Sequence, residues 1–174
     1  MNLAKLIPVI PMLLLLSAVG HTQEAETMDC SDMLMGLGDS ANFTMECKKD
    51  HSTEGQARAT HEFLNASSTD GSTTIFAVTA TAGRRTYEEP PTMGQLVDGL
   101  LRNHGDVKDG QDVAGMQTIE TTDTFASGTV PCVVFLKKGR REDVGFKRVD
   151  YGVVCTRDGA SHAYEILAKM KLPS

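Results

Sequence analysis

The chain has 174 residues and carries 17 Lys and Arg against 23 Asp and Glu, so its formal net charge is −6. An acidic excess of this size repels phosphate over most of the surface and argues against a nucleic-acid-binding role. The absence of tryptophan and an aromatic content of 5% also argue against a stacking platform for bases.

The first 20 residues have the pattern of a secretory signal peptide. Lys5 precedes an almost wholly apolar run, Leu6 to Ala18, and Ala18-Val19-Gly20 places small residues where signal peptidase cleaves. The alternative is a membrane anchor, but a span needs about 20 apolar residues, and two prolines interrupt this run. We therefore expect cleavage after Gly20, one mature domain over residues 21–174 with no membrane span, and a periplasmic or secreted location.

The expected elements follow in chain order. Residues 21–29 are polar and are predicted to be disordered, and residues 30–37 are predicted to form a short helix. Alternation of apolar and polar residues, or enrichment in β-branched residues, predicts strands. These strands are expected at 42–48, 57–66, 73–81, 117–125, 130–138 and 147–157. Segment 162–170 is helical by composition, but its position after a hairpin favours a final strand.

The clearest helix is predicted over residues 93–104. Thr92 and Gln95 have the spacing of a capping box, and Gly105 is a typical stop. The helix would carry one apolar stripe made of Met93, Leu96, Val97, Leu100 and Leu101. Together these elements predict an α+β fold, in which a twisted antiparallel sheet of five to seven strands carries this one main helix on one face.

The four cysteines are Cys30, Cys47, Cys132 and Cys155, an even number that predicts two disulfides in an exported chain. If 130–138 and 147–157 pair as an antiparallel hairpin centred between Asp143 and Val144, residues whose numbers sum to 287 face each other. Cys132 then faces Cys155, and the pairs Val134–Val153 and Leu136–Tyr151 lie on the same face. One register both joins the cysteines and buries the apolar set, which predicts a structural disulfide over a redox-active pair. Cys30–Cys47 follows by elimination.

Motifs for catalysis or metal binding are missing from the sequence. None of the five histidines (His21, His51, His61, His104 and His162) has metal-ligand spacing, and there is no C-x-x-C, G-x-S-x-G, S-x-x-K or P-loop. We therefore assign no catalytic residue, metal or cofactor. A small hydrolase or metal-dependent enzyme with a site built from dispersed residues stays open as the alternative. A pocket that gathers His51, His61 or His162 with acidic residues would favour it.

A basic cluster surrounds the predicted hairpin tip. Segment 137–148 contains six cations and two acids, so its net charge is +4. Removal of the signal peptide with Lys5 gives the mature chain a net charge of −7, so the rest of the mature chain has a net charge of −11. The cluster could contact an anionic partner, either an acidic protein surface or lipid headgroups, and a nearby loop with Arg84, Arg85 and Tyr87 could approach it. Alternatively, it is a solvated turn whose cations discourage edge-to-edge pairing. The six candidate partner-binding residues are Lys137, Lys138, Arg140, Arg141, Lys147 and Arg148.

The order of strands, capped helix, polar loop and further strands resembles exported PsbP-like and DcrB-like domains. The stretches STTIFAVTATAGRRTYEEPPTMGQLVDGLLRN and GASHAYEILAKMK carry this resemblance, which spans about residues 57–171 and includes no signature motif. The chain departs from the pattern in its expected lack of a closing C-terminal helix and in its two cysteine pairs. The resemblance implies a non-enzymatic binding or accessory module and transfers no catalytic residue. The leading hypothesis is an exported module of this kind that acts on a protein partner, such as an inhibitor or immunity-type protein. A structural envelope component is a third hypothesis.

Overall fold

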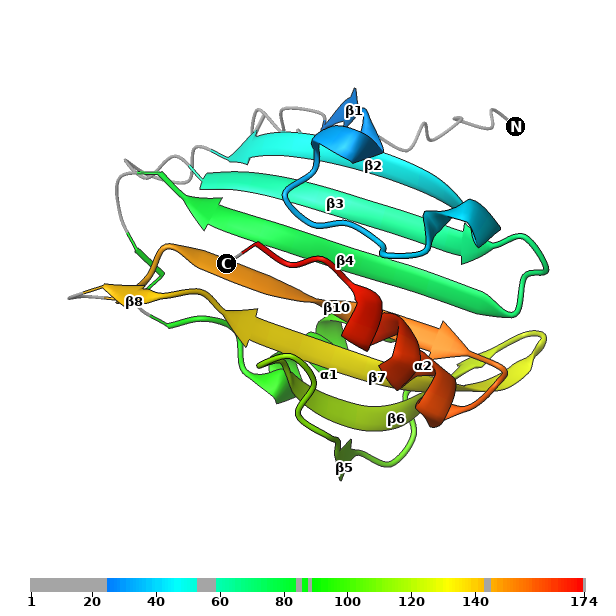
Figure 1. Ribbon diagram of the computed structural model, residues 1–174. Coiled ribbons are helices and arrows are strands. Elements are labelled where there is room, and N and C mark those ends of the chain that lie inside the picture. The colour runs from blue at the N-terminus through cyan, green and yellow to red at the C-terminus, as the bar shows by residue number, and fades with distance from the viewer. Residues whose placement is uncertain (1–24, 53–58, 84–85, 88, 143–144, 174) are drawn as a thin grey trace, which may run out of the picture.

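A large antiparallel sheet dominates the protein (Figure 1). The computed structural model describes residues 25–52, 59–83, 86–87, 89–142 and 145–173, so the predicted signal peptide and the hairpin centre at Asp143 and Val144 lie outside the described residues. The sheet has eight strands in the order β1-β2-β3-β4-β10-β7-β6-β5, and a separate pair, β8 and β9, extends from the hairpin between β7 and β10.

The strands of the main sheet are β1 (Glu26–Met28), β2 (Phe43–Ser52), β3 (Ala59–Ser68), β4 (Thr73–Ala82), β5 (Lys108–Asp109), β6 (Gln117–Phe125), β7 (Gly128–Lys138) and β10 (Arg148–Thr156). The small pair consists of β8 (Arg141–Glu142) and β9 (Gly145–Phe146). The helices are α1 (Met93–Leu100) and α2 (Ala160–Lys169), with two 3₁₀ turns, η1 (Cys30–Asp32) and η2 (Ser40–Asn42).

The predicted α+β fold with one main helix over 93–104 is wrong. The described chain is mostly antiparallel sheet, with two short α-helices that lie on opposite faces (Figure 1). Central strand β7 explains why both faces are covered, because its successive side chains point to opposite sides and are apolar on both. Val133 and Phe135 pack in the core beneath α2, whereas Cys132, Val134 and Leu136 pack beneath α1.

Helix α1 ends at Leu100, four residues earlier than predicted, because the edge of β6 binds the backbone that follows. Leu101 is already extended, with φ −114° and ψ 136°. The Asn103 N–H donates to the Asp123 carboxylate at 3.0 Å, and the Gly105 N–H donates to the Thr122 carbonyl at 3.0 Å. These contacts replace the bonds of a further helical turn.

The C-terminal segment is helix α2 and not the predicted strand, so the chain does carry a C-terminal helix. Ala163, Tyr164 and Leu167 are buried at helical spacing against the sheet. At the other end, residues 26–28 of the segment predicted to be disordered form β1, and only residues 30–32 of the predicted helix 30–37 form a helical turn.

The capping box of α1 is present as predicted. The Gln95 N–H donates to the Thr92 hydroxyl at 3.3 Å, and the Thr92 N–H donates to the Gln95 side-chain oxygen at 2.9 Å. Thr92→Ala removes one of these acceptors, so we expect the free energy of unfolding in urea to fall by about 1 kcal/mol. Thr92→Ser keeps the acceptor and should retain most of that stability; equal stability of the alanine and serine variants would contradict the assigned role.

Candidate functional site

The hairpin formed by β7 and β10 has the predicted register. Cys155 faces Cys132, Val153 faces Val134 and Tyr151 faces Leu136. Both disulfides are present, with Cα–Cα distances of 4.0 Å for Cys132–Cys155 and 5.3 Å for Cys30–Cys47. Cys132 and Cys155 are 0% and 5% exposed. This pair is therefore a buried link between two central strands.

The hairpin continues in the same register beyond the main sheet, where β8 pairs with β9 and Arg141 faces Phe146. The β4–α1 loop supports this extension, because Tyr87 and Phe146 exchange backbone hydrogen bonds of 2.7 and 3.0 Å. The approach requires Gly145: its φ is 152°, and a Cβ there would lie 2.5 Å from the Tyr87 carbonyl oxygen. Tyr87 thus lies beside the tip as predicted, whereas Arg84 and Arg85 lie outside the described residues.

Three of the six predicted partner-binding cations are engaged within the protein. Arg148, whose side chain is 15% exposed, donates from Nε to the Asp150 carboxylate at 3.1 Å and also donates to the Pro173 carbonyl. Lys137 is half-buried and faces Asp150 across the strands. Lys147 lies 3.9 Å from Glu142 and donates to the Gly83 carbonyl.

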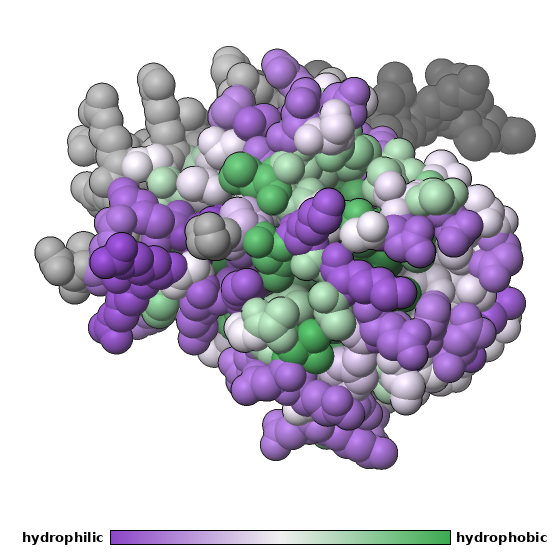
Figure 2. All heavy atoms as spheres, viewed as in Figure 1, coloured by the Kyte–Doolittle hydropathy of each residue, from purple (hydrophilic) through white to green (hydrophobic). Residues whose placement is uncertain are grey.

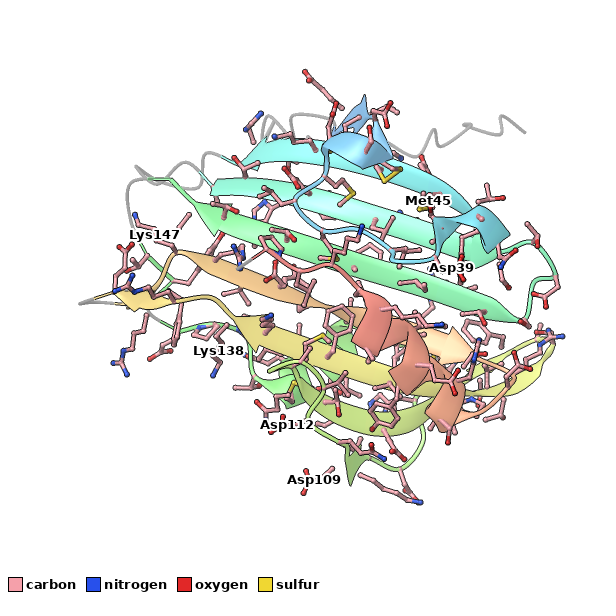
Figure 3. The ribbon with its side chains drawn as sticks, viewed as in Figure 1. Asp39, Met45, Asp109, Asp112, Lys138 and Lys147 are labelled. Atoms are coloured by element: carbon pink, nitrogen blue, oxygen red, sulfur yellow. A yellow bond between two sulfur atoms is a disulfide. The ribbon has the colours of Figure 1, made fainter. Side chains whose placement is uncertain are left out.

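The other three cations, Lys138, Arg140 and Arg141, are exposed at the end of the hairpin, and we call them the basic tip. The Lys138 ammonium lies 5.8 Å from the centre of the Phe146 ring. Figure 3 shows Lys138 and Lys147 projecting at this end of the sheet, and hydrophilic side chains gather there in Figure 2. The structure therefore brings the six cations together, but only the three of the basic tip are exposed, whereas the other three face or contact groups of the protein itself.

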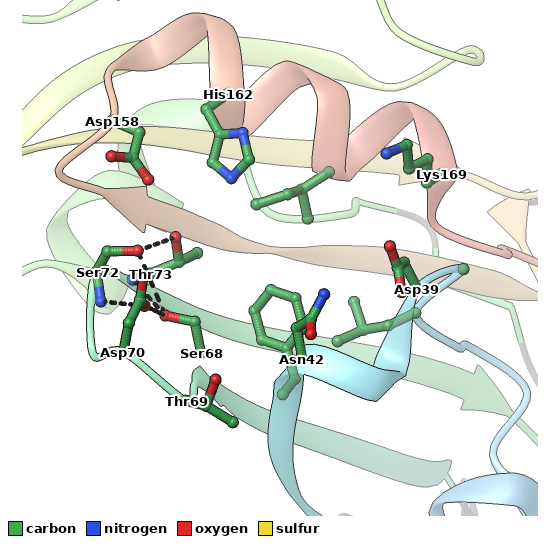
Figure 4. A pocket seen from close by; sticks show the side chains of 14 residues that line it. Asp39, Asn42, Ser68, Thr69, Asp70, Ser72, Thr73, Asp158, His162 and Lys169 are labelled. Atoms are coloured by element: carbon green, nitrogen blue, oxygen red, sulfur yellow. Dashed lines mark hydrogen bonds between the residues drawn. The ribbon is translucent and has the colours of Figure 1, made fainter.

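A polar cleft lies at the opposite end of the sheet, between α2, η2 and the β3–β4 turn (Figure 4). Its volume is about 350 Å³, and its lining includes Asp39, Asn42, Asp158, His162 and Lys169.

The β3–β4 turn that closes this cleft is held by its own hydrogen bonds. The Asp70 carboxylate accepts from the Ser68 hydroxyl at 2.6 Å and from the Ser72 N–H at 2.9 Å. These bonds lower the pKa of Asp70 to about 2. The Ser68 hydroxyl in turn accepts from the Thr73 N–H at 2.9 Å. The hydroxyls of the turn thus serve its structure.

His162 brings to this cleft the combination of histidine and acids that would favour an enzyme. Its Nδ1 lies 3.5 Å from the Glu165 carboxylate, one turn along its own helix. Within the described residues, no hydroxyl hydrogen-bonds to His162 and no three His, Cys, Asp or Glu side chains form a group that could hold a metal. His51 instead contacts Thr60 at 3.3 Å, and the His61 ring lies 6.2 Å from that of Phe63. Among the described residues, this cleft therefore holds no hydroxyl paired with His162, and the contact between Thr60 and His51 lies outside it on β2 and β3.

This cleft was not predicted from the sequence, because it joins side chains from three distant segments. A groove between segment 29–37 and strands β2 and β3, lined by Met33, Met35 and Met45, was also not predicted. The one available signal was the local density of methionine between residues 28 and 45.

Over the ranges that the structure describes, the fold is a disulfide-linked antiparallel β protein with one short helix on each face of its main sheet. Within the residues described, no helix is long and apolar enough to cross a membrane. Comparison with protein-family models, curated proteins and solved structures finds no match. The resemblance to PsbP-like and DcrB-like domains therefore stays a prediction.

Proposed function

We propose that this is an exported, non-enzymatic binding or accessory protein that contacts an acidic surface of a protein partner through the basic tip. The observation that carries the proposal is the exposure of Lys138, Arg140 and Arg141 at the end of a hairpin that is braced on two sides. A disulfide links its two strands, and the Tyr87 loop pairs with its extension. Two disulfides also support export, because such bonds persist mainly in oxidising compartments.

A braced hairpin is suited to binding because its backbone has little conformational freedom left to lose on association. The cations belong to a segment of net charge +4 in a chain of net charge −6, so positive charge is concentrated at one end. Such an asymmetric distribution steers an anionic partner toward the tip and raises the association rate. Exposed charges are screened over about 8 Å at physiological ionic strength, so the effect should weaken with salt.

The triple substitution of Lys138, Arg140 and Arg141 by serine tests this proposal. A photoreactive amino acid placed at Glu142, which is exposed beside the basic tip, first captures the partner in the native cell, and association is then measured with the purified pair. We expect the triple variant to keep the wild-type unfolding midpoint and to associate about tenfold or more slowly at low salt. The difference should shrink as salt is added.

A matched control replaces three other exposed cations, Arg102, Lys108 and Arg157, with serine. It makes the same change in net charge away from the tip, so it should associate at nearly the wild-type rate. The proposal fails if the tip variant associates as fast as the wild type at low salt, or if the control slows association equally.

A further inference from the structure

The methionines are distributed unequally between the two faces of the sheet. Seven methionines follow residue 20, and six of them belong to the apolar cluster beneath α2. These six are Met28, Met33, Met35, Met45, Met116 and Met170. The seventh, Met93, packs beneath α1 on the opposite face. The thioether sulfurs are thus concentrated on one side of the protein.

Three of these methionines line one open groove. The groove has a volume of about 460 Å³ and lies between segment 29–37 and strands β2 and β3, with Met33, Met35 and Met45 in its lining. Met35 is 1% exposed, whereas Met33 and Met45 are half-buried at the groove. Figure 3 shows Met45 on β2, and Figure 2 shows hydrophobic side chains reaching the surface of this face.

The wall of the groove is fixed by contacts at several points. Gly36 and Lys171 exchange two backbone hydrogen bonds of 2.9 Å. The Leu34 N–H donates to the Glu62 carboxylate at 2.8 Å, and Cys30 is linked to Cys47. The segment that supplies Met33 and Met35 is therefore held in place relative to Met45 on β2.

The thioethers are the soft metal ligands that the lining of the groove offers. The Asp29 carboxylate accepts from both the N–H and the hydroxyl of Ser31, at 2.9 and 2.8 Å. Cys30 cannot supply a thiolate because it is in a disulfide. Thioether sulfur is a soft donor that selects Cu(I) over hard or borderline divalent ions. Lys171 in the lining adds a positive charge, which opposes cation binding and opposes a divalent ion more than a monovalent one.

We infer that this groove is a binding site for Cu(I), with Met33, Met35 and Met45 as its sulfur ligands. Methionine also fills gaps in ordinary cores, and that role accounts for Met116, which is 0% exposed. Met33 and Met45 also pack against this core, but they are half-buried and line the open groove, so their side chains are accessible to an ion there. A thioether also stays available as a ligand in an oxidising compartment, whereas the cysteines of this chain are all in disulfides and offer no thiolate. The inference is independent of the basic tip.

The test is an anaerobic titration of the folded protein with Cu(I) against a chromophoric Cu(I) chelator. We expect one ion to bind per chain, and the double variant Met33→Leu, Met45→Leu to bind at least tenfold more weakly. Leucine has nearly the same volume as methionine, so the fold should tolerate both changes. Met93→Leu on the opposite face is the matched control and should bind as the wild type does.

A second measurement does not depend on the folding of any variant. Ag(I), a redox-inert probe for a Cu(I) site, is added to wild-type protein carrying ¹³C-labelled methionine methyl groups. The methyl resonances of Met33, Met35 and Met45 should shift, while that of Met93 should not. Failure to compete with the chelator, unchanged affinity in the double variant, equal loss in Met93→Leu, or shifts confined to other methionines would each overturn the inference.

Discussion

Replacing both Cys132 and Cys155 with alanine is expected to lower the free energy of unfolding by about 3 kcal/mol. The two residues are separated by 23 positions, so their disulfide closes a loop that reduces the conformational entropy of the unfolded chain. They also join β7 and β10, the strands that pack against both helices. Urea unfolding of the wild type and of the double variant, followed by circular dichroism, measures the loss.

The Cys30–Cys47 pair provides the control, because its separation of 17 positions predicts a similar loop entropy at a different place in the fold. It joins η1 to β2 near the edge of the sheet. Its removal should raise hydrogen exchange mainly in residues 26–37 and leave the amides of β7 and β10 protected. An unchanged urea midpoint after loss of Cys132–Cys155 would show that the sheet holds these strands without the disulfide.

The β7–β10 register could be predicted from sequence because two separate signals specify it. Pairing Cys132 with Cys155 also places Val134 opposite Val153, so the covalent and apolar requirements agree. A shift of one residue would turn every apolar side chain of one strand to the other face. The strands on either side were found for similar reasons, because alternation or β-branched residues mark each of them.

The two helices show where local sequence was insufficient. Segment 160–169 contains residues that are compatible with both strand and helix, and packing of Leu167 against the sheet decides in favour of the helix. Helix α1 ends early because the backbone N–H of Asn103 donates to the carboxylate of Asp123, which lies twenty residues further along the chain. Both outcomes depend on contacts between distant segments, which periodicity does not report.

The division of the basic cluster also depends on contacts across strands. A row of polar side chains crosses five strands in direct register: Lys49 faces Glu62, Glu62 faces Thr79, Thr79 faces Asp150, and Asp150 faces Lys137. Glu62 lies 3.3 Å from the Lys49 ammonium, and the Thr79 hydroxyl donates to Asp150 at 2.9 Å. The sequence places Lys137 at the tip, whereas the sheet makes it part of this row.

Asp150 is the residue in this row whose loss should cost most. Its side chain is 0% exposed and accepts from Arg148 and Thr79. Asp150→Ala removes a fully buried carboxylate that accepts from both the Arg148 guanidinium and the Thr79 hydroxyl, so we expect the free energy of unfolding to fall by about 3–5 kcal/mol. Glu46→Ala is the control, because it breaks an exposed ion pair with Lys48 and should cost about 1 kcal/mol or less. Urea unfolding at neutral pH compares the two, and equal losses would contradict a special role for the buried pair.

The pH dependence provides a second check on the same carboxyl group. Burial raises the pKa of Asp150 above its ordinary value of 3.8, although the Thr79 hydroxyl and Arg148 act in the opposite direction. The folded protein therefore holds this proton more tightly than the unfolded chain does. The contribution of the group to stability is thus greatest below pH 3.8 and declines as pH rises through the folded pKa. Asp150→Asn cannot titrate, so the stability of the wild type relative to Asp150→Asn should decrease as pH rises from acid toward neutral, whatever the constant cost of replacing the carboxylate. A difference that instead grows with pH would show that Arg148 and Thr79 outweigh burial and lower the pKa of Asp150.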